Sequence, residues 1–122
     1  MNLQKKITLS PIKNISGIVD LPGSKSVSNR ILLLSMLAKG KTEIKNLLDS
    51  DDIRFMIEGM KKLGIKLDEN RNKNIISVSG TSGTIPVKNA NLMLGNAGTA
   101  IRPLTAAVTL GHGNFVLDGI PR

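Results

Sequence analysis

Two stretches of small and polar residues lead directly into apolar segments, and this pattern limits the possible folds more than any other feature of the chain. The first, residues 21–30, reads L-P-G-S-K-S-V-S-N-R and precedes the apolar residues 31–38. Because residues 17–21 are rich in β-formers, the predicted order is strand, tight loop and helix. Such a loop presents unpaired backbone N–H groups and the positive end of the helix dipole, which attract anions.

The first loop also carries the side chains that an anion site needs. Ser24, Ser26 and Ser28 supply hydroxyls, Lys25 supplies an ammonium group and Arg30 a guanidinium group. Serines before a helix also serve as caps, and Lys and Arg are common on any surface, so a purely structural loop is the alternative interpretation. The loop therefore predicts a phosphate or carboxylate site and leaves that alternative open.

A second pass of the same kind follows later in the chain. Residues 91–94 predict a short strand, 95–99 a loop of small residues, 102–110 an apolar helix and 114–117 another strand. Both passes have a small-residue loop, an arginine, a helix and a glycine turn in the same order, which indicates an internal repeat of about seventy residues. The chain stops partway through the second repeat, so we expect it to be a fragment of a longer protein.

The first pass predicts a full unit of the order β-α-β-α-β-β. Its strands are expected at residues 17–21, 42–47, 65–67 and 75–78, and its helices at 31–38 and 51–63. The first helix is apolar on most sides and is closed by Gly40, so we expect it to be buried almost all round. Asp49 and Ser50 are expected to cap the second helix and Gly64 to end it. Residues 3–9 predict an additional edge strand.

Composition narrows the class of protein. The 122 residues are 40% apolar, which is enough for one domain with a real core. The absence of Cys and the single His argue against a disulfide framework and a zinc centre, so no metal is expected. No apolar run reaches membrane-spanning length, so no membrane association is expected, and a cytosolic location is predicted.

The net charge of +8 predicts a polyanionic partner or a small anionic substrate. A basic nucleic-acid-binding module is therefore the alternative function, although aromatic residues are only 2% and the stacking surfaces of single-strand binders are missing. A nucleotide-binding P-loop is a further rival, but residues 23–26 lack the preceding glycine and spacer that wrap a triphosphate. The lysines follow no single helical face, so the anion hypothesis rests on Lys25 and Arg30.

Four motifs together carry a resemblance to a known family. They are L-P-G-S-K-S-V-S-N-R at residues 21–30, G-K-T at 40–42, N-L-L-D-S-D-D at 46–52 and L-G-N-A-G-T-A-I-R-P-L at 94–104. In this order they resemble the N-terminal part of the 5-enolpyruvylshikimate-3-phosphate synthases. The related enolpyruvyl transferase that acts on UDP-N-acetylglucosamine lacks the S-K-S-x-S-N-R run.

The resemblance implies an α/β fold of two domains, each an inside-out α/β barrel of three β-α-β-α-β-β units with the helices gathered inside. Residues 1–21 would belong to the second domain of the intact enzyme, and residues 22–122 would form the first one and a half units of the other. The implied reaction transfers the enolpyruvyl group from phosphoenolpyruvate to the 5-hydroxyl of shikimate 3-phosphate and releases phosphate. No cofactor is implied.

The resemblance also implies roles for individual residues. Lys25, Ser26 and Arg30 would bind shikimate 3-phosphate, and Lys25, Asn96 and Gly98 would bind phosphoenolpyruvate. Gly98 would let the ligand lie against the backbone, because any Cβ there would occupy the ligand's space. The acid and base groups of the family lie beyond this chain, in the missing C-terminal portion that would be its partner. No catalytic residue is therefore assigned, and the fragment alone is expected to be inactive.

For three further groups of residues the sequence allows both a functional and a structural interpretation. Arg102 could serve the site, or it could be structural and pair with a helix end or with the carboxylates of residues 49–52. Asp51 and Asp52 could act as acids or bases, but their place in the first turn of a helix favours a capping role. His112 lies between two glycines, which favours an exposed turn residue over a base.

Overall fold

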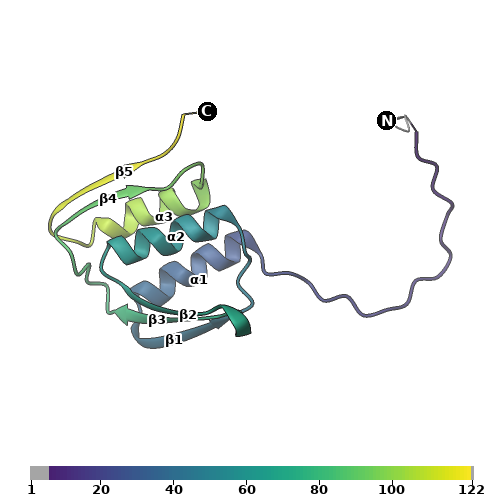
Figure 1. Ribbon diagram of the computed structural model, residues 1–122, viewed down its shortest axis with the longest axis horizontal. Helices are drawn as coiled ribbons and strands as arrows, with labels where there is room; N and C mark the ends of the chain where they lie inside the picture. The colour runs from purple at the N-terminus through teal and green to yellow at the C-terminus, as the bar shows by residue number, and fades with distance from the viewer. Residues whose placement is uncertain (1–5, 122) are drawn as a thin grey trace.

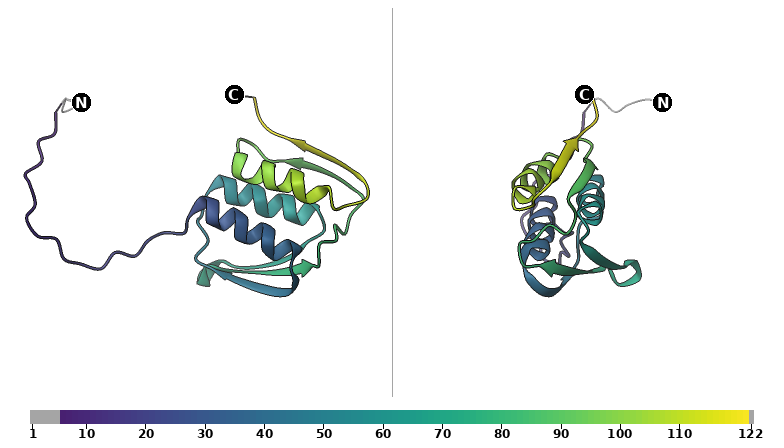
Figure 2. Two further views of the ribbon diagram at one scale, coloured as in Figure 1. Left: turned by 180° about the vertical axis from the view of Figure 1, so that it is seen from behind. Right: turned by 90° about the vertical axis from the view of Figure 1, so that its left-hand side faces the viewer.

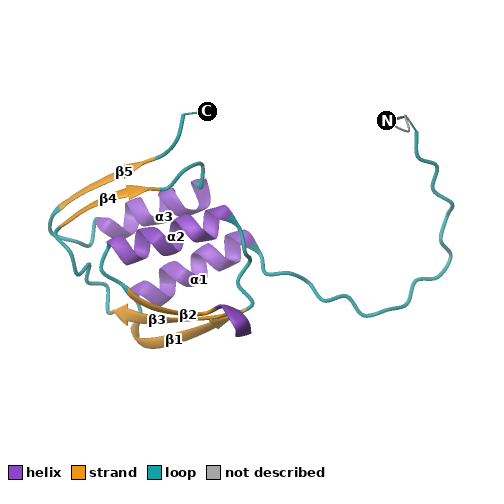
Figure 3. Ribbon diagram, in the orientation of Figure 1, coloured by secondary structure: helices purple, strands orange, loops and turns teal. Residues whose placement is uncertain are grey.

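The computed structural model describes residues 6–121 and contains three helices arranged between two small sheets (Figure 1). Its elements in chain order are α1 (Lys25–Leu37), β1 (Lys39–Lys45), α2 (Asp51–Lys62), β2 (Lys66–Asn70), the 3-10 turn η1 (Arg71–Lys73), β3 (Ile75–Thr81), β4 (Asn89–Met93), α3 (Gly98–Val108) and β5 (Asn114–Asp118). Colouring by secondary structure shows the helices between the β4–β5 pair and the sheet of β1, β2 and β3 in this orientation (Figure 3). The α/β class predicted from the sequence is confirmed.

The two sheets have different topologies. In the first sheet the strand order is β1-β3-β2, and both pairs are antiparallel. The β2–β3 pair is the predicted hairpin, with η1 at its turn. In the second sheet β4 and β5 pair in parallel, with Asn89 opposite Asn114, and α3 provides the crossover that a parallel pair requires. The second pass therefore forms the predicted strand, helix and strand.

Helix α2 shows the apolar stripe that its sequence predicts. Ile53, Met56, Ile57 and Met60 are buried on one face, while Arg54 and its polar neighbours face solvent. Gly64 takes a φ of +84°, which favours glycine, and ends the helix as expected. By contrast, Gly40 lies within β1 and does not end α1, because α1 already stops at Leu37.

Helices α1 and α3 begin earlier than the apolar pattern predicts. The predicted loop residues from Lys25 to Arg30 form the first turns of α1, and α3 already starts at Gly98. The pattern missed these turns because their residues are mostly polar in α1 and mostly small in α3, and apolar periodicity detects only the parts of a helix that face a core. The candidate side chains of Lys25, Ser26 and Arg30 therefore sit on a helix, which holds them more rigidly than a loop would.

The prediction that α1 is buried almost all round is wrong. Leu32 and Met36 are fully buried, but Val27, Ile31 and Leu34 are exposed, Leu34 by 60%. These three follow one another at helical spacing, so α1 presents an apolar stripe that the described residues leave uncovered.

The prediction of two strands before α1 is also wrong for the described residues. Residues 6–21 contain no strand and extend away from the helices and sheets in two opposite views (Figures 1 and 2), and residues 3–5 of the predicted edge strand lie outside the described part. The large apolar side chains of this segment are exposed, namely Ile7, Leu9, Ile12, Ile15, Ile18, Val19 and Leu21. A β-strand needs a neighbour for its backbone hydrogen bonds, and residues 6–121 offer none here.

Candidate anion-binding site

The first turns of all three helices meet at one cavity of about 480 Å³. It is lined by Lys25, Ser26, Arg30, Asp52, Asn96, Gly98, Thr99, Arg102 and Pro103. None of the three N-cap residues, Ser24, Ser50 and Ala97, makes a side-chain capping hydrogen bond. Three helix dipoles therefore direct their positive ends towards the same region, which favours a bound anion.

All five predicted site residues line this cavity. Lys25, Ser26 and Arg30 come from α1, Asn96 comes from the loop before α3, and Gly98 is the first residue of α3. A Cβ built on Gly98 would meet no heavy atom within 4 Å, so its backbone faces open space. The structure thus brings together two segments about seventy residues apart, while the binding roles of these residues stay predictions.

A chain of polar contacts links the three helices beside the cavity. The Lys25 ammonium nitrogen lies 3.3 Å from Asp52 Oδ2. The Thr99 hydroxyl donates to the same Asp52 oxygen at 3.0 Å, and the Asn29 side-chain amide donates to the Thr99 oxygen at 2.8 Å. Lys25 therefore lies next to the 95–99 turn and is held from the first turn of α2.

The remaining cations of the cavity have no carboxylate partner in the described part of the chain. Neither Arg30 nor Arg102 forms an ion pair with any carboxylate among residues 6–121. The interpretation in which Arg102 pairs with the carboxylates of residues 49–52 is wrong, because Asp49 and Asp51 pair with Arg54 and Asp52 pairs with Lys25. Three cations and one carboxylate line the site, so its charge is positive and suits an anionic ligand.

Sequence reasoning missed four residues of this neighbourhood. Thr99 and Pro103 line the cavity, Asn29 supports it, and Asp52 faces it although capping was favoured for both aspartates. The sequence could not separate Asp52 from Asp51, because both suit the first turn of α2. Only the fold distinguishes them: the Asp51 side chain is 83% exposed and pairs with Arg54, whereas that of Asp52 is 24% exposed.

The predicted caps of α2 are only partly correct. Ser50 occupies the N-cap position, but its hydroxyl is buried and makes no hydrogen bond among the described residues. Asp49 lies outside the helix and accepts two hydrogen bonds from the Arg54 guanidinium. The N-terminal amides of α2 are therefore not capped by a side chain, as at the other two helices.

The start of α1 is held against the loop that leads into α2. The backbone N–H of Leu48 donates to the Ser28 hydroxyl at 3.3 Å. A Cβ on Gly23 would collide with the carbonyl oxygen of Asn46 and would lie 2.6 Å from the Leu48 nitrogen. Only glycine allows this close approach, which fixes the chain just before Lys25.

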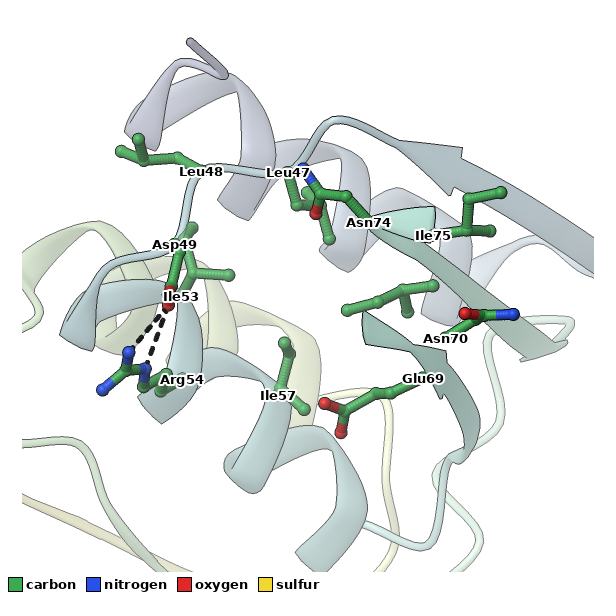
Figure 4. A pocket seen from close by; sticks show the side chains of 11 residues that line it. Leu47, Leu48, Asp49, Ile53, Arg54, Ile57, Glu69, Asn70, Asn74 and Ile75 are labelled. Atoms are coloured by element: carbon green, nitrogen blue, oxygen red, sulfur yellow. Dashed lines mark hydrogen bonds and ion pairs between the residues drawn. The ribbon is translucent and has the colours of Figure 1, made fainter. Parts of the chain in front are cut away.

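A larger cavity of about 600 Å³ lies between α2 and the ends of β2 and β3 (Figure 4). Its floor is apolar, with Leu47, Ile53 and Ile57 buried. Its cation, Arg54, is already paired with Asp49 and Asp51. This cavity contains none of the predicted site residues, and its other carboxylate, Glu69, pairs with Lys61 outside the cavity. The smaller cavity is therefore the candidate site despite its smaller volume.

Two further observations limit what the described residues can do. Among residues 6–121, no group of three or more His, Asp or Glu side chains is placed to hold a metal ion. Within the same part of the chain, none of the helices has the length and apolarity needed to cross a membrane.

Comparison with known proteins gives one consistent family. The family model described as EPSP synthase (3-phosphoshikimate 1-carboxyvinyltransferase) matches residues 9–122. The chain is 56% identical over 125 residues to the chloroplastic 3-phosphoshikimate 1-carboxyvinyltransferase 1 of Nicotiana tabacum, and 54% identical over 119 residues to the 3-phosphoshikimate 1-carboxyvinyltransferase of Shewanella loihica. These matches cover 96% and 97% of this chain.

A solved structure of EPSP synthase from Acinetobacter baumannii has the same fold, with a TM-score of 0.74 at 24% identity over 85% of this chain. This likeness supports the incomplete inside-out α/β architecture predicted from the motifs. The chain spans 24% and 28% of the length of the two relatives and 23% of the solved chain. Because some relatives are named chloroplastic and others are not, the cytosolic location stays a prediction.

Proposed function

Because the chain belongs to the EPSP synthase family, we propose that it forms part of an enzyme that transfers the enolpyruvyl group from phosphoenolpyruvate to shikimate 3-phosphate. The acceptor is the 5-hydroxyl of the shikimate ring, and inorganic phosphate is released. Both substrates are anions, and the observation that carries the proposal is the cavity where three uncapped helix N-termini meet Lys25, Arg30 and Arg102. This activity places the protein in the shikimate pathway, which supplies chorismate for aromatic amino acid biosynthesis.

The first pass holds shikimate 3-phosphate in this proposal. Ser26 donates its hydroxyl and Arg30 its guanidinium to the substrate, and both side chains line the cavity. The guanidinium suits a phosphate because its planar fork can donate two hydrogen bonds at once. Its lack of a carboxylate partner among residues 6–121 supports this role, because the charge remains available to a ligand.

The second pass holds phosphoenolpyruvate. Asn96 contributes its side-chain amide, and Gly98 leaves open space beside the backbone at the first turn of α3. Lys25 lies between the two groups and contacts both substrates. An ammonium group has three donors, so it can serve two ligands and still keep one contact with the protein.

Residues 6–121 provide binding groups without an evident acid or base. Asp52 is the only carboxylate among the residues that line the cavity, and it is engaged by Lys25 and Thr99. Positioning without proton transfer does not complete the reaction. The isolated chain is therefore expected to bind substrate and to be catalytically inactive until the missing C-terminal portion is supplied.

The chain also divides between the two domains of the intact protein. Residues 22–122 form one and a half units of one domain, and residues 1–21 belong to the other. The extended course of residues 6–21 supports this division, since their apolar side chains are exposed and no strand pairs with them in the described part of the chain. Partner strands from the missing portion would cover them.

Calorimetric titration of the chain with shikimate 3-phosphate, with and without a supplied C-terminal portion, tests the proposal. Lys25→Met should weaken binding by about ten- to a hundredfold, because a charge-assisted hydrogen bond contributes about 1.5 to 3 kcal/mol. Lys41→Met is the matched control, since this exposed lysine of β1 lies outside the cavity. Indifference to shikimate 3-phosphate together with steeply salt-dependent binding of DNA or RNA would instead support the nucleic-acid module.

A further inference from the structure

We propose that Asp52 is a positioning residue that orients the Lys25 ammonium towards the two substrates. This inference rests on the proposed function of the cavity and adds a role for a carboxylate that lies inside an anion site. Asp52 does not contact substrate in this proposal. It fixes one hydrogen of Lys25 and thereby directs the other two.

The geometry around Asp52 differs from that of an ordinary helix-terminal aspartate. One of its oxygens, Oδ2, receives both the Lys25 ammonium at 3.3 Å and the Thr99 hydroxyl at 3.0 Å. The carboxylate thus joins the first turns of α1, α2 and α3 at one atom. A carboxylate that served only the dipole of α2 would need neither of these contacts, and Asp51 provides that charge one residue earlier.

The position of the carboxylate is itself fixed by a buried group. Asn29 is only 1% exposed, and its side-chain amide nitrogen donates to the Thr99 oxygen at 2.8 Å. With its oxygen accepting from Asn29, the Thr99 hydroxyl can donate its own hydrogen to Asp52. The buried Asn29 amide on α1 therefore orients the Thr99 hydroxyl on α3. This hydroxyl in turn fixes the position of the Asp52 carboxylate that holds Lys25.

The donor count of Lys25 agrees with this role. The Lys25 side chain is 48% exposed and carries its charge at the end of a flexible four-carbon stem, so without a partner it would sample many positions. Its ammonium has three hydrogens, of which Asp52 takes one. Two remain, one for each of the substrates that the proposed function assigns to Lys25. A tetrahedral group with one direction fixed presents these two hydrogens on the side away from Asp52.

Simple charge repulsion predicts the opposite change in ligand affinity when Asp52 is removed, and this makes the proposal testable. A carboxylate at the edge of an anion site repels the ligand, so on charge alone the removal of Asp52 should tighten anion binding. If Asp52 positions Lys25, the same removal should weaken binding, because the ammonium loses its orientation. The direction of the change in affinity therefore separates the two roles.

The test compares Asp52→Asn with Asp51→Asn in calorimetric titrations with phosphoenolpyruvate and with shikimate 3-phosphate. The two variants remove the same charge from adjacent residues of the first turn of α2, but Asp51 pairs with Arg54 and does not line the cavity. We expect Asp52→Asn to weaken phosphoenolpyruvate binding about tenfold and Asp51→Asn to leave it unchanged. Asp52→Glu, which keeps the carboxylate, should recover part of the loss.

A double-mutant cycle shows whether the effect passes through Lys25. In a Lys25→Met background, Asp52→Asn should leave the affinity unchanged or raise it. The proposal would be overturned if Asp52→Asn weakened binding equally in the presence and absence of Lys25. It would also be overturned if Asp52→Asn tightened binding in the chain that keeps Lys25. Thermal unfolding of each variant shows that the compared proteins are folded.

A second measurement needs no ligand and separates this inference from the proposed function. Carbon-13 relaxation of the Lys25 ε-methylene group should report restricted motion in the unmodified chain and in Asp51→Asn, and motion like that of exposed Lys41 in Asp52→Asn. If the unmodified chain binds neither substrate even with the C-terminal portion supplied, the proposed function has failed, and this measurement still decides whether Asp52 holds Lys25. Equal mobility of Lys25 with and without the Asp52 carboxylate refutes the positioning role.

Discussion

The N-terminal ends of α1 and α3 contribute similar groups to the cavity, but the chain segments that lead into these two helices are held in place in different ways. Before α3, strand β4 pairs in parallel with β5, and the Leu94 N–H donates to the Asp118 carbonyl at 2.8 Å just beyond the paired residues. Before α1 no strand is present among the described residues, and the chain extends away from the fold (Figure 2). The repeat therefore brings both helix starts to one cavity, while the support for each start differs.

At α1 the support comes from the side instead of from a preceding strand. Gly23 packs against the backbone at residues 46–48, and Ser28 accepts a hydrogen bond from Leu48. These contacts tie the helix start to the loop before α2. The comparison indicates that Gly23 has a structural role, whereas Gly98 faces open space and its binding role stays a prediction, although both glycines lie at the start of a helix in similar motifs.

The largest effect is expected for Gly23→Ala. The new Cβ would collide with the Asn46 carbonyl oxygen and lie 2.6 Å from the Leu48 nitrogen, and backbone atoms cannot move aside as a flexible side chain would. We expect the free energy of unfolding to fall by about 3 kcal/mol, at the upper end for overpacking. Urea denaturation of the variant measures this change, and a loss of less than about 0.5 kcal/mol would mean that the α1 entry is not held by this contact.

The second effect is expected for Gly98→Ala, and it concerns binding instead of stability. No heavy atom lies within 4 Å of the added Cβ, so the free energy of unfolding should be unchanged or should rise by less than about 1 kcal/mol, because alanine favours helix. The methyl group would project into open space beside the cavity, so phosphoenolpyruvate binding should weaken about tenfold. Calorimetry with shikimate 3-phosphate provides the control, since its affinity should change little.

The sequence predicted the second pass better than the first for a physical reason. Strands β4 and β5 find each other within the chain, so local patterns there agree with the final pairing. The predicted strand at residues 17–21 has equally suitable β-forming residues, but strand formation depends on a partner, and no pattern within the segment reveals where that partner is. The apolar pattern of α1 likewise predicted burial almost all round, because a pattern within one helix does not reveal which neighbours will cover its faces.

The candidate site was predictable to the extent that motifs encode it. Lys25, Ser26, Arg30, Asn96 and Gly98 were identified from two motifs, and the fold places them around one cavity. Asp52 could not be chosen over its neighbour Asp51, because the side of α2 that faces the cavity is set by packing against α1 and α3. Contacts such as that between Asn29 and Thr99, which are 70 residues apart, have no signature in either segment alone.

A smaller effect is expected on the apolar stripe of α1, which distinguishes this helix from α2. Val27, Ile31 and Leu34 are exposed, whereas the outward face of α2 is polar. Exposed apolar stripes promote association, so the isolated chain is expected to self-associate at high concentration. Leu34→Lys should weaken association by about 1 kcal/mol, or roughly fivefold, because part of a leucine side chain no longer becomes buried.

Sedimentation velocity over a range of concentrations measures this association. Lys61→Met serves as the matched control on α2, since it changes the charge away from the α1 stripe. A chain that stays monomeric and monodisperse before any substitution would contradict the expectation that the stripe is an interaction surface.

The smallest effect concerns Lys61, which joins α2 to β2 and lies outside the candidate site. Its ammonium pairs with Glu69 at 2.8 Å and with Glu58 at 2.9 Å, and hydrogen bonds to Glu69 first and Glu58 second raise its pKa above the ordinary value of 10.5. A raised pKa in the folded state means that the stabilisation is fully present below pH 10.5 and is lost as the pH rises through the folded value. Because the side chain is 42% exposed, Lys61→Met should cost less than about 1 kcal/mol at pH 8. Urea unfolding of both proteins at pH 8 and pH 11 measures this effect, and the difference in their free energies of unfolding should shrink at the higher pH. Substrate affinity at pH 8 should be unchanged. If the difference in free energy stays constant, packing of the Lys61 stem, and not its charge, links α2 to β2.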